Sequence, residues 1–289
     1  MSRLFAFGLG FSAQVLAARL SAKGWQIAGT ARDVGKIGQL AVRDYEIAQY
    51  SGEAGNSALP HALHGTTHLL HSIPPGPEGD PALEHYREEI AKLSSLEWIG
   101  YLSTVGVYGD QEGRWVDETT EPKPNSARTE ARVEAEQAWL EFGAATGVPV
   151  QIFRLAGIYG RGRSVFDKLR SGTARRVKKD GQVFSRIHVE DIASVLEASI
   201  ARPRAGAIYN VADDEPAAPG EVVAYAAELI GVPAPPEIAF DEADLTPMAQ
   251  SFYEGSRRIA NARIKSELGV TLRYPTYREG LAALLNTQR

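Results

Sequence analysis

A glycine turn near the amino terminus narrows the choice of folds more than any other feature of the chain. Arg3–Phe7 has the composition of a strand, and the apolar spacing predicts a helix over Ser12–Ala22. Between them, residues 8–13 read GLGFSA, which matches the pattern G-x-G-x-x-A. The first glycine permits a tight turn, and the second lets another group approach the backbone closely. A strand, a glycine turn and a helix in this order are typical of an α/β domain.

Short β-rich runs alternate with helical stretches through the first two-thirds of the chain, which predicts parallel βαβ units. Further strands are predicted at Gln26–Thr30, Tyr45–Gln49, Thr66–Ser72, Trp98–Ser103, Pro149–Arg154 and Ile208–Val211. Further helices are predicted at Gly35–Arg43, Ser57–Leu63, Leu83–Leu93 and Ala127–Ala145. We therefore expect an α/β fold: a doubly wound parallel sheet of the Rossmann type, with a smaller, mostly C-terminal substrate lobe.

Composition excludes several classes of protein. The 289 residues are 44 % hydrophobic and 23 % charged, which is ordinary for a globular chain. The absence of cysteine excludes disulfides, a cysteine nucleophile and thiolate metal sites. The net charge of −5 does not indicate a protein that binds nucleic acid. The apolar runs are too short to span a membrane. The apolar amino terminus resembles a signal peptide, but glycine and polar residues interrupt it. We therefore interpret it as a strand followed by a helix, and we expect a cytoplasmic protein.

The glycine turn predicts a dinucleotide-binding domain. Backbone N–H groups at the start of the following helix, with the positive end of its dipole, suit a diphosphate. We assign residues 1–160 and 187–213 to this domain, and residues 161–186 and 214–289 to the smaller lobe. The residues expected to contact the cofactor are Gly8, Gly10, Phe11, Ser12, Arg32, Ser72, Ile73, Pro74, Ser103 and Arg132.

The end of the second strand selects between cofactors. NAD sites usually carry an acidic residue there, which binds a ribose hydroxyl. This chain has Arg32, whose planar cation suits a 2′-phosphate, so we predict NADP in preference to NAD. Asp33 is the counter-argument, because a shift of one residue would present a carboxylate instead. A surface pair between these two residues is the structural alternative.

Four later segments add to the glycine turn, and together they resemble the extended short-chain dehydrogenase/reductase family, which includes nucleotide-sugar epimerases and dehydratases. They are STVGVYG at 103–109, RLAGIYG at 154–160, RIHVEDIA at 186–193 and YNVA at 209–212. The resemblance covers nearly the whole chain. It implies a nicotinamide cofactor, a serine or threonine that orients the substrate oxygen, and a Tyr-x-x-x-Lys pair whose tyrosine exchanges a proton.

This chain departs from the family pattern at the Tyr-x-x-x-Lys pair, which occurs nowhere in it. Counting along the family motifs puts the orienting hydroxyl at Thr104 and the lysine position at Arg132, four residues before Glu136. The tyrosine position becomes Arg128. An arginine binds ribose and supplies charge, but it does not give up a proton near neutral pH. Tyr108 or Tyr159 is then the candidate replacement, with packing against the smaller lobe as the alternative.

Several other residues allow either a functional or a structural role. In the family the smaller lobe helps to form the substrate pocket, and we expect Tyr159, Arg186 and His188 to contact substrate. A buried histidine bonded to the backbone is an equal alternative for His188. Histidines 61, 64, 68 and 71 give no common metal-binding geometry, so we expect no metal. The expected partner is a small-molecule substrate, with neither nucleic acid nor membrane, and the family resemblance also allows a homodimer.

Two classes of function remain open at this stage. The first is an NADP-dependent oxidoreductase or epimerase-like enzyme, in which Thr104 holds the substrate oxygen and Tyr108 or Tyr159 exchanges the proton. The second is a catalytically silent regulator or redox sensor that binds NADP(H). The missing Tyr–Lys pair favours the regulator, and it also weakens a third reading, a nucleotide-sugar enzyme with the usual epimerase chemistry.

Overall fold

The structure, a computed structural model, describes residues 1–76 and 78–286, which divide into two compact units. Unit 1 comprises residues 1–104, 126–154 and 193–209, and unit 2 comprises residues 105–125, 155–192 and 210–289. The predicted boundaries put residues 105–125 in the dinucleotide-binding domain, whereas their backbone neighbours place them in unit 2. The division into a cofactor lobe and a substrate lobe stays a prediction.

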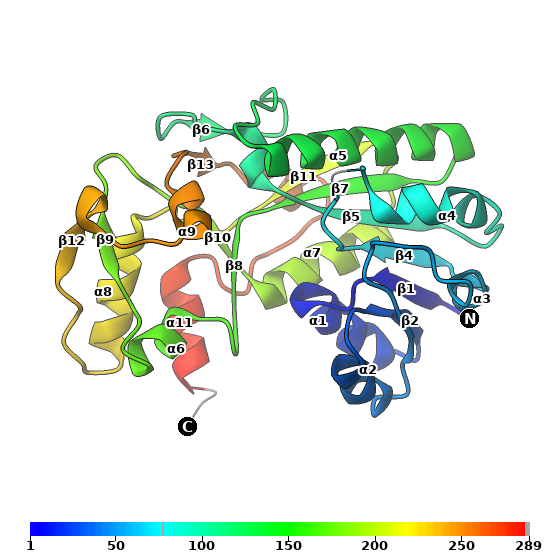
Figure 1. Cartoon of the computed structure of the whole chain (residues 1–289), viewed down its shortest axis with the longest axis horizontal. Helices are drawn as coiled ribbons and strands as arrows, with labels where there is room; N and C mark the ends of the chain where they lie inside the picture. Colours follow the sequence, from blue (N-terminus) through cyan, green and yellow to red (C-terminus); the bar gives the residue numbers. More distant parts are fainter. Residues whose placement is uncertain (77, 287–289) are drawn as a thin grey trace. The chain divides into compact units, whose positions relative to one another are not determined.

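The expected doubly wound sheet is present, with seven strands in the order β11-β7-β5-β4-β1-β2-β3 (Figure 1). The strands are β1 (Arg3–Phe7), β2 (Gln26–Ala31), β3 (Glu46–Gln49), β4 (His68–His71), β5 (Trp98–Thr104), β7 (Val150–Leu155) and β11 (Ala207–Val211). β1 pairs in parallel with β2 on one side and with β4 on the other. The strand order therefore reverses at β1, and the turn that follows it lies at the switch point where such sheets bind ligands.

Five helices of this fold lie close to their predicted positions: α1 (Phe11–Ser21), α2 (Val34–Ala41), α3 (Leu59–Leu63), α4 (Pro81–Ala91) and α5 (Ala127–Thr146). A further helix, α7 (Val189–Ala201), has no counterpart among the predicted ranges. The helix predicted from Leu83 begins earlier, at Pro81, because the Asp80 carboxylate accepts hydrogen bonds from the first amides of α4. α5 begins at a capping box formed by Ser126 and Thr129 and ends at Gly147, which has a left-handed conformation.

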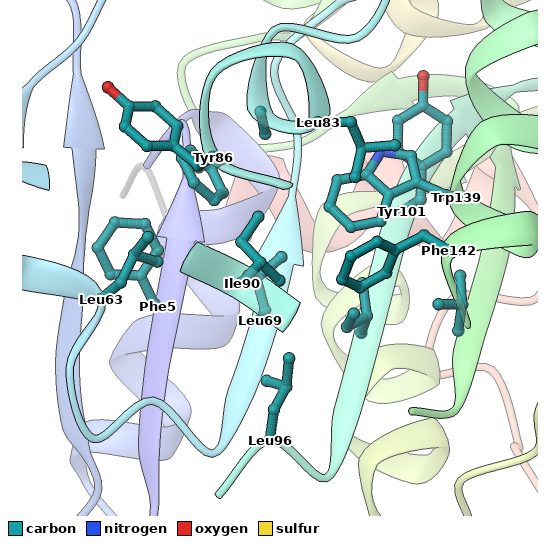
Figure 2. Close-up of a cluster of buried hydrophobic side chains, with 14 of the residues drawn as sticks. Phe5, Leu63, Leu69, Leu83, Tyr86, Ile90, Leu96, Tyr101, Trp139 and Phe142 are labelled. Atoms are coloured by element: carbon teal, nitrogen blue, oxygen red, sulfur yellow. The ribbon is translucent and has the colours of Figure 1, made fainter. Parts of the chain in front are cut away.

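One hydrophobic core of unit 1 lies between the sheet and the helices α3, α4 and α5. Figure 2 shows Phe5 and Leu69 of the sheet beside Ile90 of α4, with Trp139 and Phe142 of α5 packed over β5. These side chains are almost completely buried. On α1, the Arg19 guanidinium donates to Glu197 of α7 at 3.0 Å, so these two helices are neighbours. Among the described residues, no helix is both long and apolar enough to cross a membrane.

Unit 2 contains short elements that sequence periodicity does not predict. The strands are β6 (Trp115–Val116), β8 (Gly157–Tyr159), β9 (Arg176–Lys178), β10 (Arg186–His188), β12 (Glu237–Ala239) and β13 (Arg258–Ile259). They form three parallel pairs: β8 with β10, β9 with β12 and β6 with β13. The helices are α6 (Val165–Arg170), α8 (Pro219–Leu229), α9 (Pro247–Phe252), α10 (Ala262–Ser266) and α11 (Tyr277–Asn286). Strands of two or three residues are too short to show an alternating pattern.

Candidate functional site

The glycine turn of unit 1 has the geometry that a bound diphosphate requires. Gly8 has a φ of +84°, and a side chain there would meet Ser72 Oγ and Ile73 Cγ1 at 3.0 Å. The Gly8 N–H donates to Thr30 Oγ1 at 2.8 Å, which ties the turn to the end of β2. The Ser72 hydroxyl donates to the Gly8 carbonyl at 2.5 Å, which ties the turn to the segment after β4. The turn is therefore held from both neighbouring strands.

The start of α1 has no side-chain cap and no acidic residue in its first turn. Gly10 is exposed, forms the N-cap without a side chain, and precedes a first turn that contains no acidic residue. A Cβ at Gly10 would have only the Gly8 carbonyl oxygen within 4.0 Å. Ser12 and Ala13 are buried, so the small residues of the motif let α1 pack closely on the sheet. The residues of this turn fit a dinucleotide diphosphate.

At the end of β2, the structure separates the roles of Arg32 and Asp33. Asp33 is the N-cap of α2, and its Oδ1 accepts from the Lys36 amide at 2.7 Å. Arg32 is exposed, and its backbone carbonyl accepts from the Gln49 side chain at 3.1 Å. One oxygen of the carboxylate is thus committed to the helix, while the guanidinium extends from the surface of the loop.

Arg132 of α5 reaches the carboxyl end of β5. Its Nη1 donates to the Leu102 carbonyl at 2.9 Å and to the Tyr101 hydroxyl at 3.2 Å. The guanidinium has further N–H groups, and the Arg132 side chain is half-buried. Arg128, at the family's tyrosine position, is exposed on the same helix. Thr104 is the last residue of β5 and is half-buried.

A buried ion pair contacts this end of β5 through Ser103. Arg154 of β7 and Glu136 of α5 are joined at 2.7 Å, and each side chain is 4 % exposed. The Ser103 hydroxyl donates to the same carboxylate at 2.5 Å. The predicted cofactor residue Ser103 therefore has an intramolecular partner.

A second buried pair, His71 with Asp80, was not predicted from the sequence. His71 Nε2 lies 2.7 Å from Asp80 Oδ2, and the side chains are 0 % and 1 % exposed. Burial alone would raise the pKa of Asp80, but the charge and hydrogen bond of His71 and the Leu83 amide together hold that pKa below its usual value. The pair joins the end of β4 to the start of α4. No local pattern links two residues that are separated by a proline-rich loop.

In unit 2, Tyr108 lies in a buried polar network. It is 0 % exposed, and its hydroxyl donates to Asn210 Oδ1 at 2.8 Å. The backbone N–H of Asn210 donates to Glu118 Oε1 at 2.7 Å. Burial raises the pKa of Glu118, although the hydrogen bond from Asn210 opposes that shift. The Tyr108 proton is therefore engaged with an amide oxygen.

The predicted substrate residues lie on the β8–β10 pair, where Tyr159 and His188 are register partners. His188 Nδ1 accepts from the Glu190 amide at 3.2 Å, as in the backbone-bonded alternative. Arg186 Nη1 donates to the Phe184 carbonyl at 2.9 Å. Burial raises the pKa of Tyr159, and the nearby carboxylates raise it further, so its phenol stays protonated.

Asp213 lies close to Arg186 in the same unit and was not predicted as a site residue. Its amide donates to the Arg186 carbonyl at 2.6 Å. Burial raises the pKa of Asp213 to about 8, and the charge of Arg186 reduces that shift. With that pKa the carboxyl group is mostly protonated at neutral pH, and it lies beside a cation. In the sequence Asp213 is the first of three consecutive acidic residues after a strand, which gives no signal for burial beside an arginine.

The fold and the glycine turn define a Rossmann-type α/β protein with a dinucleotide site. A family model described as "NAD dependent epimerase/dehydratase family" matches residues 82–212. Protein YeeZ from Escherichia coli (strain K12) is 30 % identical over 290 residues, which cover 95 % of this chain and 97 % of YeeZ. The chain belongs to the NAD-dependent epimerase/dehydratase family.

Solved structures similar to this chain share its fold. A functionally unknown conserved protein from Silicibacter pomeroyi is 49 % identical to this chain, with a TM-score of 0.90, and the alignment covers 100 % of both chains. A dTDP-glucose 4,6-dehydratase from Bacillus anthracis, solved in complex with NAD, is 17 % identical with a TM-score of 0.76. The alignment covers 99 % of this chain and 96 % of the dehydratase. At that identity the likeness establishes the fold alone.

Proposed function

We propose that the chain is an NADP(H)-binding oxidoreductase or epimerase-like enzyme with a non-standard active site. Its substrate class would be a small carbonyl compound or alcohol, or a sugar-like molecule. The observation that carries the dinucleotide part is the glycine turn, which is fixed by Thr30 and Ser72 and followed by a helix whose first amides come after an N-cap without a side chain. Those amides would bind the diphosphate.

The choice of NADP over NAD rests on the end of β2. Arg32 extends from the loop, while Asp33 is engaged as the cap of α2. A guanidinium favours a 2′-phosphate, whereas a carboxylate there would repel it. The dehydratase from B. anthracis was solved with NAD, so the cofactor preference proposed here differs from what that structure contains.

Catalysis in this proposal uses residues at the end of β5. A bound nicotinamide supplies or accepts a hydride. Thr104 would donate a hydrogen bond to the substrate oxygen. Arg132, fixed by the Leu102 carbonyl and the Tyr101 hydroxyl, would hydrogen-bond the ribose and favour negative charge nearby. Because an arginine stays protonated, it cannot serve as the proton donor.

Both candidate proton donors, Tyr108 and Tyr159, are buried. Tyr108 would have to give up a proton that is hydrogen-bonded to Asn210 Oδ1, and its phenolate would then face an amide oxygen. Tyr159 is nearly buried, and its environment strongly favours the neutral phenol. These two observations favour the second candidate function, a catalytically silent regulator or redox sensor that binds NADP(H).

A calorimetric titration tests the binding proposal. We expect heat of binding with NADP, and weaker binding with NAD. If neither nucleotide gives heat, both the enzymatic and the regulatory proposals fail. If NAD binds more tightly than NADP, the choice of cofactor is wrong while the dinucleotide site stands.

A substrate panel separates the enzyme from the regulator. Carbonyl compounds and nucleotide sugars are incubated with NADPH, and absorbance at the nicotinamide band is followed. Any turnover should fall by about 10²- to 10⁴-fold in Tyr108→Phe if Tyr108 exchanges the proton, and should also fall in Thr104→Ala. Equal turnover in both variants and the wild type would remove these residues from the site. Binding without turnover across the panel would favour the regulator.

A further inference from the structure

Arg186 of unit 2 keeps one edge of its guanidinium without a partner in the described part of the chain. Its Nη1 donates to the carbonyls of Phe184 and Ala217, at 2.9 and 3.2 Å. No described residue accepts a hydrogen bond from Nε or Nη2, or forms an ion pair with the guanidinium. The side chain is half-buried, so solvent still reaches part of it. The Nε–Nη2 edge is a face that matches the two oxygens of a carboxylate.

Arg154 of unit 1 illustrates the usual way in which a buried arginine is satisfied. Its Nε and Nη2 donate to the Glu136 carboxylate, at 3.2 and 2.7 Å. The carboxyl group that acts electrostatically on Arg186 is Asp213, which forms no ion pair with it. Burial raises the pKa of Asp213 to about 8, so this group is mostly a neutral donor at neutral pH. Arg186 therefore lacks the counter-charge that Arg154 has.

Three buried polar atoms close to Arg186 have no hydrogen-bond partner among residues 1–76 and 78–286. They are Asp213 Oδ2, Tyr159 Oη and Tyr277 Oη. Both phenols act electrostatically on Arg186, and its Cζ lies 6.0 Å from the centre of the Tyr277 ring. Folded proteins leave few buried polar groups unpaired. A neutral carboxyl group, a phenol and a guanidinium are all donors, so the group that would satisfy them is an acceptor with negative charge.

The other acidic side chains of this region have partners of their own. Asp214 Oδ1 lies 2.5 Å from Lys265 Nζ, and Glu215 Oε1 lies 3.0 Å from Arg278 Nε. Two further carboxylates, which act on Tyr159 and accept hydrogen bonds from backbone amides, are Asp191 and Glu279. The remaining titratable side chains beside Tyr159 and Arg186 are His188 and Tyr253. These carboxylates are compensated locally, which leaves the charge of Arg186 to an outside anion.

We propose that unit 2 contains a binding site for a small carboxylate, in which the Nε–Nη2 edge of Arg186 binds both oxygens and the Asp213 carboxyl group donates a further hydrogen bond. The site does not depend on the proposed dinucleotide site, which lies in unit 1. An anionic ligand binds the form in which Asp213 is protonated, because ionised Asp213 would repel it. Affinity therefore falls as pH rises through about 8, the pKa of Asp213.

The test uses the full chain with acetate, propionate and benzoate, each compared with its carboxamide by ligand-observed NMR. We expect saturable binding of carboxylate, with the carboxamide at least about tenfold weaker, because it has no charge to strengthen its hydrogen bonds. Between pH 6 and pH 9 the protonated fraction of a group with a pKa of about 8 falls about tenfold. The Kd should rise by the same factor.

Two variants and a control assign the effect to residues. Asp213→Asn keeps a donor of the same shape that does not ionise, so its Kd should be the same at pH 6 and pH 9. Arg186→Gln should lose at least about tenfold in affinity at both pH values, and Arg186→Lys should recover part of it. Asp214→Asn changes the exposed neighbour that is paired with Lys265, and it should keep the pH dependence of the wild type. Circular dichroism melts verify that the variants fold.

Each remaining outcome has a distinct meaning. If no carboxylate of the panel binds to the wild type, or if the carboxamides bind as tightly, the proposal fails. An unchanged Kd in Arg186→Gln would also overturn the site. A Kd for Asp213→Asn that still rises between pH 6 and pH 9 would overturn the role of Asp213. Binding of NADP bears on the proposed function alone, so either conclusion can fail without the other.

Discussion

At the scale of single residues, the buried His71–Asp80 pair is a source of stability that ordinary sequence patterns do not reveal. Both side chains are removed from water, so each depends on the other for compensation of its lost hydration. Asp80 also accepts from the amides of Ala82 and Leu83, and so begins α4. One carboxylate thus stabilises a helix terminus and the end of a strand.

Asp80→Asn should destabilise the protein most near neutral pH. The amide can still cap α4, but it loses the charge that pairs with His71, at a cost of about 3 kcal/mol. Because the folded-state pKa of Asp80 lies below its ordinary value of 3.8, the contribution is complete above that pH and is lost as pH falls further. Urea unfolding at several pH values should show the difference in unfolding free energy shrinking below about pH 4.

The matched control for Asp80→Asn is Glu88→Gln, also on α4. Glu88 forms an exposed pair with Lys92 at 3.3 Å. Exposed pairs contribute little to stability, so this variant should unfold close to the wild type. A wild-type advantage over Asp80→Asn that stays constant down to pH 3 would contradict the assigned charge role.

At the scale of elements, the connection from β1 to α1 depends on β2. The hydroxyl of Thr30, on a fully buried side chain, accepts from the Gly8 amide, and the Thr30 carbonyl accepts from the Leu9 amide. The turn is thus shaped by β2, which comes after the whole of α1 in the chain. A glycine motif indicates that a tight turn is allowed, whereas these bonds determine where its amides point.

Thr30→Val should therefore weaken both stability and dinucleotide binding. Valine has nearly the same shape but leaves the Gly8 amide without its acceptor, which costs about 1–3 kcal/mol of unfolding free energy. Urea unfolding measures that loss, and calorimetry with NADP measures the loss of affinity. Thr30→Ser keeps the hydroxyl and serves as the control. Equal NADP affinity in Thr30→Val and Thr30→Ser would show that this bond does not position the turn.

At the scale of the whole molecule, the two units can be followed separately by tryptophan fluorescence. Trp25, Trp98 and Trp139 belong to unit 1, and Trp115 belongs to unit 2. Trp115 is 59 % exposed, so its replacement should disturb packing little. In Trp115→Phe, the emission reports only the unit that contains the glycine turn.

NADP should stabilise that unit by mass action. At a free concentration of about 100 times Kd, a ligand that binds only the folded state raises the unfolding free energy by about 2.7 kcal/mol. Urea unfolding of Trp115→Phe, followed by fluorescence with and without NADP, should give a higher midpoint with the nucleotide. An unchanged midpoint at saturating NADP would argue against a site in unit 1.

Local patterns were sufficient for the α/β class and the main strands, because hydrophobic spacing and glycine turns act between residues close in the chain. The strand at Arg3–Phe7 and the long helix from Ala127 were both predicted from such patterns. Counting along family motifs singled out Arg132, and in the structure its guanidinium donates to the Leu102 carbonyl near the end of β5. The cofactor class followed from the same short-range features, through the turn that precedes α1.

Long-range packing settled the environments of the polar groups. Asp33 is an N-cap, Tyr108 is hydrogen-bonded to Asn210, and Asp213 lies beside Arg186. Burial, charge and hydrogen bonding set the chemistry of such groups, and all three depend on neighbours distant in the chain. Residue types alone can nominate a carboxylate or a phenol. Its protonation and its partner come from the folded arrangement, because desolvation and Coulomb energy are properties of position in space.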